Sequence, residues 1–156
     1  MIVSCDGASR GNPGPAGIGV QLTDGDGAVL AEIARGLGVA TNNQAEYTAV
    51  LEGLRRALEL GASDVLVRSD SRLLVEQLSG RFRVKNPTLQ RLHKEVRDVA
   101  RSFSKVRYEH VPRERNTEAD RLANEGVDAW LAAGGEVSPS SGPRTPSLWE
   151  EPGGRG

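Results

Sequence analysis

Sulfur and imidazole ligands are scarce in this sequence of 156 residues, which contains one cysteine, Cys5, and two histidines, His93 and His110. A single cysteine excludes an intramolecular disulfide and a thiolate metal cage. Two histidines argue against an imidazole-based metal site. Any metal ion would therefore be held by oxygen atoms, which favours Mg²⁺ or Mn²⁺.

Long apolar runs are also missing, since no stretch approaches the roughly 20 residues needed to cross a bilayer. Residues 1–4 carry neither the basic region nor the apolar segment of a signal peptide. Hydrophobic residues make up 37% of the chain and charged residues 26%, which is typical of a globular domain with one core. We therefore expect a cytoplasmic protein, monomeric and without a membrane partner.

Charge is almost balanced overall, at −1, but it is unevenly distributed along the chain. Residues 81–115 hold 11 basic and 4 acidic side chains. Such a basic segment in a neutral protein suggests a polyanionic partner. The alternative is that these side chains form a solvated helix face, and charge alone does not separate the two interpretations.

Apolar periodicity predicts strands over residues 2–6, 18–22, 29–37, 64–69 and 106–111, and helices over residues 43–60, 71–78, 88–103 and about 117–131. The first three strands are expected to form an antiparallel meander, with a turn-rich loop at residues 7–15. The nearly continuous apolar run at 64–69 suits a central parallel strand. We predict an α/β fold over residues 1–133, with a mixed five-stranded sheet flanked by helices. Residues 134–156, rich in Gly, Pro and Ser, are predicted to be a disordered tail or linker.

The helix predicted at 43–60 carries an acid on its apolar face. Its apolar stripe includes Val50, Leu54, Ala57 and Leu58, and Glu46 lies on the same stripe, in what the pattern indicates is the first turn. An acid in the first turn of a helix is ordinarily there to complement the helix dipole. A buried carboxylate, however, requires a positive partner.

Three further acids stand where predicted elements begin or end. Asp6 ends the first strand, Asp70 ends the fourth, and Asp120 lies in the first turn of the last helix, which Asn116 or Thr117 is expected to cap. Taken singly, these acids have ordinary explanations: a turn initiator, a helix cap and a dipole partner. If the first and fourth strands are adjacent and parallel, however, the first two acids come side by side.

A cluster of these four acids would be costly without cations. Two unit charges about 5 Å apart repel by about 3 kcal/mol at an effective dielectric constant near 20. Four together amount to roughly 10–20 kcal/mol, which is comparable to the stability of a whole domain. Such a cluster either takes up protons or binds cations. Two Mg²⁺ ions about 3.5–4 Å apart would form a clamp for phosphoryl transfer.

Over residues 1–132 the chain resembles the ribonuclease H type 1 family. Four motifs carry the resemblance, in the family's order: DGASRGNPGP at residues 6–15, TNNQAE at 41–46, SDS at 69–71 and NTEADRLA at 116–123. The resemblance implies the RNase H-like fold, with strands 1–3 antiparallel and strands 4–5 parallel. It also implies an endonuclease that cuts the RNA strand of RNA/DNA hybrids, leaving 5′-phosphate and 3′-hydroxyl ends.

The resemblance further assigns roles to individual residues. Asp6, Glu46, Asp70 and Asp120 would hold two Mg²⁺ ions, for which Mn²⁺ is expected to substitute. One ion would activate water and the other would stabilise the leaving 3′-oxygen. The expected contacts to the riboses and phosphates of the hybrid, recognised without regard to sequence, come from Gly7, Ser9, Arg10, Asn12, Asn42, Asn43, Gln44, Ser71, Arg83 and Asn116.

Two departures from the family pattern place the chain in a subgroup. The loop before Asp120 is short and lacks the histidine found in many relatives, so Arg113 or Arg115 is expected to act in its place, electrostatically, because arginine cannot be a base at neutral pH. His110 is assigned to the strand at 106–111. The basic protrusion of some relatives is reduced here to about residues 80–86, where Arg83 lies.

Two alternatives stay open on the sequence alone. Asn42 or Asn43 would serve as the helix cap instead of, or in addition to, contacting substrate. The whole domain would be a non-cleaving hybrid-binding module if it used the groove contacts without the chemistry, although such a module would not need four acids.

Overall fold

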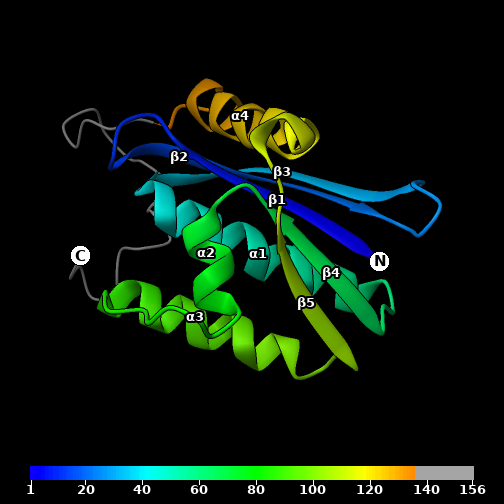
Figure 1. Ribbon diagram of the computed structural model, residues 1–156. Helices are drawn as coiled ribbons and strands as arrows, with labels where there is room; N and C mark the ends of the chain where they lie inside the picture. The colour runs from blue at the N-terminus through cyan, green and yellow to red at the C-terminus, as the bar shows by residue number, and fades with distance from the viewer. Residues whose placement is uncertain (136–156) are drawn as a thin grey trace.

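The computed structural model describes residues 1–135, which form one sheet with helices on both faces (Figure 1). The predicted tail, from residue 136 onward, lies outside the described residues. The strands are β1 (Ile2–Ser9), β2 (Gly14–Thr23), β3 (Val29–Ala40), β4 (Asp64–Ser69) and β5 (Lys105–His110). The helices are α1 (Asn42–Glu59), α2 (Arg72–Leu78), α3 (Pro87–Ala100) and α4 (Thr117–Ala132), with a 3₁₀ turn, η1 (Arg113–Arg115), before α4.

The strand order is β3-β2-β1-β4-β5. The first three strands pair antiparallel, whereas β4 pairs parallel to both β1 and β5. The mixed five-stranded sheet and the inner position of β4 are therefore confirmed. The parallel register pairs Ser4 with Arg68. Asp6 and Asp70 each follow two residues later, so both strands deliver an acid to the same edge of the sheet.

The first strand is longer than the sequence predicts. It continues past Asp6 to Ser9, with Asp6 opposite Gly19 and Ser9 opposite Ala16 of β2. The prediction that Asp6 ends the strand and that residues 7–15 are all loop is therefore wrong. The glycines and prolines after Asp6 are local turn signals, but hydrogen bonds to β2, which depend on residues distant in sequence, keep the chain extended.

Helix α4 lies alone on one face of the sheet, while α1 and α3 lie on the other (Figure 1). Glycines let α4 approach the strands closely. A Cβ atom at Gly19 would lie 2.0 Å from the carbonyl oxygen of Ala119, and one at Gly17 would lie 2.7 Å from that of Ala123. The backbone of α4 therefore rests directly against the backbone of β2, with no side chain between them.

Helix α1 packs against β1 and β2 on the opposite face, where Gly53 meets Val3 and Val20. Most of its predicted apolar stripe is buried, but Leu58 is 41% exposed, so its assignment to the buried face is wrong. Leu58 is the second-last residue of the helix, which ends at Glu59. Among residues 1–135, none of the helices has the length and apolar character that a bilayer crossing requires.

Candidate active site

Three acids from three different elements meet at one edge of the sheet. Asp6 comes from β1, Glu46 from α1, and Asp70 directly follows β4. One carboxylate oxygen of each lies within 4.8 Å of the corresponding oxygen of the other two. Three carboxylates at this separation can hold a metal ion through oxygen ligands alone, which is the donor set that Mg²⁺ and Mn²⁺ prefer.

Glu46 is placed by the start of α1. Thr41 is the N-cap: its hydroxyl accepts the backbone N–H of Gln44 at 3.2 Å, and the Gln44 side chain accepts the N–H of Thr41 at 2.7 Å. This excludes the alternative in which Asn42 or Asn43 caps the helix. Since α1 begins at Asn42, Glu46 lies in its second turn rather than in the predicted first, so dipole pairing does not explain the acid.

Asp70 is presented by a turn that its neighbours stabilise. The Ser69 hydroxyl accepts the N–H of Ser71 at 3.0 Å, and the Ser71 hydroxyl caps α2 by accepting the N–H of Leu74 at 3.2 Å. The cap that the sequence offered as an ordinary role for Asp70 is thus provided by Ser71. This leaves the Asp70 carboxylate available to the acidic cluster.

Asp120 is brought to the same place by α4, in whose first turn it lies as predicted. Asn116, just before that helix, is 2% exposed, and its Nδ2 donates to the carbonyl of Cys5 at 2.9 Å. Asn116 occupies the predicted N-cap position, where its carbonyl accepts the N–H of Asp120 at 3.1 Å, but its side chain makes no cap bond. Its amide instead ties the start of α4 to the β1 residue beside Asp6.

The pKa values of Asp6 and Glu46 are raised by burial and by the neighbouring carboxylates. Burial, together with the nearby carboxylates of Asp70, Asp120 and Glu46, raises the pKa of Asp6 to about 8. Burial also raises the pKa of Glu46 to about 7, against hydrogen bonds from Ser71 and Asn42 that favour its charged form. Without bound cations, the cluster would hold protons near neutral pH, because the described residues bring too little positive charge to compensate for it.

Arg113 is the main positive charge that acts on this cluster from the short loop. Burial raises the pKa of Asp70, whereas Arg113, and to a smaller extent His110, act in the opposite direction. Arg113 is exposed and lines the same cavity as the acids, and His110 ends β5 opposite Ser69, in the strand where it was predicted. Arg115 is also exposed but does not line the cavity.

The four acids border one open cavity of about 410 Å³. The other predicted residues that line it are Gly7, Ser9, Arg10, Asn42 and Arg113.

The remaining predicted contacts lie outside this cavity. Asn12 accepts the N–H of Asn42 at 3.1 Å. The side chains of Gln44 and Ser71 make hydrogen bonds that cap α1 and α2, respectively. Asn116 is buried. Asn43 is exposed on the first turn of α1, and Arg83 is exposed on the loop between α2 and α3.

Asn124 also lines the cavity, and the sequence reasoning missed it. Its Nδ2 donates to the backbone carbonyl of Asp120 at 3.0 Å, and its Oδ1 accepts from Arg10 Nη2 at 3.3 Å. Arg10 also pairs with Asp128 at 2.8 Å. The helical period could have identified Asn124. Residues four apart lie on one face of a helix, and this spacing relates Asp120, Asn124 and Asp128.

This mixed sheet, with its helices on both faces and acids at one edge, defines the RNase H-like fold. The sequence matches the Reverse transcriptase-like family over residues 4–126. The chain belongs to the ribonuclease H family.

Individual relatives agree with this assignment. The chain is 49% identical over 130 residues to the bifunctional protein Rv2228c of Mycobacterium tuberculosis, covering 83% of this chain but only 36% of the relative. It is 44% identical to the crystal structure of RNase H1 from Halobacterium salinarum, with a TM-score of 0.80, covering 82% of this chain and 97% of that one. It is 40% identical to LC11-RNase H1 in complex with an RNA/DNA hybrid, also with a TM-score of 0.80, covering 83% and 98%.

Proposed function

We propose that this domain is an endonuclease that hydrolyses the RNA strand of RNA/DNA hybrids and leaves 5′-phosphate and 3′-hydroxyl ends. The observation that carries the proposal is the convergence of Asp6, Glu46, Asp70 and Asp120 on one open cavity. Likeness to a relative crystallised with an RNA/DNA hybrid supports the choice of substrate.

The four carboxylates would hold two Mg²⁺ ions, with Mn²⁺ as a substitute. Bound there, the metal would supply Lewis-acid stabilisation of the charge that develops on the phosphate, and would lower the pKa of the attacking water. The raised pKa values of Asp6 and Glu46 fit a site built for cations, because a divalent ion would replace the protons that crowding otherwise requires.

The protein's own groups orient the hybrid around this centre. Gly7, Ser9, Arg10 and Asn42 line the cavity wall, within reach of riboses and phosphates in the wide minor groove of an A-form-like duplex. Arg113 would place a fixed positive charge beside the reacting phosphate. Arg115, Asn12, Asn43, Gln44, Ser71, Arg83 and Asn116 are proposed to contribute from outside the cavity, the capping residues by holding the backbone in place.

The test is cleavage of an end-labelled RNA/DNA hybrid with Mg²⁺ or Mn²⁺, alongside the same duplex made wholly of DNA. Wild type should cut only the RNA strand, and Asp70→Asn should lower the rate by at least about 100-fold. Asp64→Asn is the matched control, since Asp64 is exposed at the other end of the same strand. If folded wild type binds the hybrid and cuts nothing with either metal, the domain is a binding module. A cytoplasmic location and a monomeric state are part of the proposal, and size-exclusion chromatography tests the latter.

A further inference from the structure

A buried polar bridge connects the helix that carries Glu46 to the basic loop at residues 79–86. Tyr47, the residue after Glu46, is 1% exposed, and its hydroxyl donates to Gln77 Oε1 at 2.6 Å. Gln77, on α2, is itself 7% exposed. A buried hydroxyl paired with a buried amide at this distance is a strongly restrained contact, since either group would be costly to leave unpaired.

The same amide holds the loop. Gln77 Nε2 donates to the carbonyl of Arg83 at 3.4 Å, and Gln90 Nε2, from α3, donates to the next carbonyl, that of Val84, at 2.9 Å. The backbone carbonyl of Gln77 also lies 3.0 Å from His93 Nε2 on α3. Two amides from two helices therefore donate to successive carbonyls of the loop, the bond from Gln90 being the shorter.

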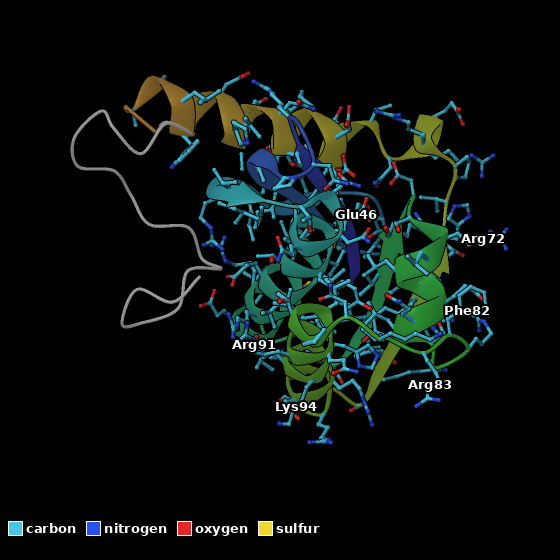
Figure 2. The ribbon with its side chains drawn as sticks, turned by 90° about the vertical axis from the view of Figure 1, so that its left-hand side faces the viewer. Glu46, Arg72, Phe82, Arg83, Arg91 and Lys94 are labelled. Carbon is cyan, nitrogen blue, oxygen red and sulfur yellow. The ribbon has the colours of Figure 1, made fainter. Side chains whose placement is uncertain are left out.

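The start of the loop is fixed as well. The backbone N–H groups of Arg81 and Phe82 donate to the carbonyl of Glu76 at 2.9 and 3.2 Å, and the side chains of Arg81 and Glu76 form an ion pair at 2.7 Å. With its backbone held in this way, the loop directs Phe82, which is 51% exposed, and Arg83 outward (Figure 2). Arg72 lies on the same side of the molecule, above Phe82 and Arg83 in the view of Figure 2.

We propose that Tyr47 is a positioning residue for substrate affinity, which acts through Gln77 to fix the Arg83 loop relative to the acidic site. The proposal rests on the hybrid-binding function proposed above. A loop already held in its binding geometry loses less conformational freedom when a duplex binds, so Arg83, which points outward, contributes more to affinity. This restraint offsets the small number of basic residues in the loop. Tyr47 itself touches neither the cavity nor the solvent.

The experiment is a double-mutant cycle on hybrid affinity. Dissociation constants are measured by fluorescence anisotropy, without divalent metal, for wild type, Tyr47→Phe, Arg83→Ala and the double variant. Tyr47→Phe removes one hydroxyl and should weaken binding roughly three- to tenfold, the loss expected for one hydrogen bond. In the Arg83→Ala background the same change should have less effect, because the side chain that the Gln77 contact positions is then gone.

A merely structural role would change stability alone, so the cleavage kinetics provide a second readout. We expect Tyr47→Phe to raise KM and leave kcat at saturating hybrid unchanged. Tyr108→Phe, on β5, is the matched control and should bind as wild type does. Additive effects of Tyr47→Phe and Arg83→Ala, or unchanged affinity in Tyr47→Phe, would overturn the proposal. If wild type binds hybrid without cutting it, the nuclease function fails while the affinity cycle still decides this inference.

Discussion

Replacing Gly19 with alanine should disable the site from a position that touches neither substrate nor metal. A Cβ atom there would lie 2.0 Å from the carbonyl oxygen of Ala119 and 2.3 Å from the backbone nitrogen of Ala123. Ordinary contacts begin at 3.4 Å, so α4 must move away from the sheet by more than 1 Å. Ala119 immediately precedes Asp120, which therefore moves with the helix.

The expected magnitudes follow from that displacement. Overpacking of this kind costs about 1–3 kcal/mol. In a domain of this size each kcal/mol lowers Tm by about 2–4 °C, so Tm should fall by roughly 2–12 °C. Misplacing a catalytic group by about 1 Å lowers the rate by about 100-fold. We therefore expect kcat for hybrid cleavage to fall by about that factor in Gly19→Ala, with a smaller change in KM.

The assay is steady-state cleavage of labelled hybrid, paired with thermal unfolding of the same preparations. Gly25→Ala is the control, because a Cβ atom at Gly25, in the turn between β2 and β3, meets nothing within 4 Å. A Gly19→Ala protein with the Tm and kcat of wild type would refute the close contact. A lowered Tm with an unchanged kcat would refute the claim that the position of α4 places Asp120.

Three further outcomes are expected. Because the folded pKa values of Asp6, about 8, and Glu46, about 7, lie above their ordinary values of 3.8 and 4.5, their contribution to stability is present at low pH and lost as pH rises through about 7–8. Tm of the metal-free protein should therefore fall between about pH 5 and pH 9, and saturating Mg²⁺ should reduce that fall. A Tm that stays constant over this range would contradict the raised pKa values of the two acids. Asn116→Ala leaves a buried carbonyl unpaired and should destabilise the fold by about 1–3 kcal/mol in urea titrations, whereas a loss below experimental error would show that the tether is unimportant. Arg113→Ala removes the charge that lowers the pKa of Asp70, so the acidic limb of the pH–rate profile should move to higher pH. Arg113→Lys keeps the charge and should retain most of the wild-type profile. An acidic limb that does not move in Arg113→Ala would exclude this role for Arg113.

The sequence predicts the element order because helices and strands differ in local periodicity. The parallel direction of the fourth and fifth strands comes instead from the family resemblance. The apolar run at 64–69 and the stripe that includes Val50 and Leu54 each report burial within a few residues of chain. The burial of Glu46, at 8% exposed, follows from the same stripe.

The errors over β1, β2 and Asn116 concern contacts between segments that are distant in sequence, whereas the start of α1 was misjudged by one or two residues locally. The extension of β1 to Ser9 depends on β2, and the turn residues after Asp6 indicate the opposite. Gly17 and Gly19 weaken β2 as a strand when judged locally, yet they provide the space that α4 occupies. Asparagine is a residue type that commonly caps helices, but the side-chain amide of Asn116 donates instead to the carbonyl of Cys5, 111 residues away.

Each acid of the cluster arrives on its own element: Asp6 on β1, Glu46 on α1, Asp70 after β4 and Asp120 on α4. Asp6, Glu46 and Asp70 all precede α2, whereas Asp120 joins them only when α4 packs on the sheet. Under the metal-site proposal, a form of the domain in which α4 has not packed would therefore bind the ion more weakly than the native fold. Under the same proposal, binding of the metal at full affinity would report the fraction of molecules in which α4 has packed on the sheet. A titration with Mn²⁺, followed by its paramagnetic effect on water relaxation, would count native molecules in a mixed population.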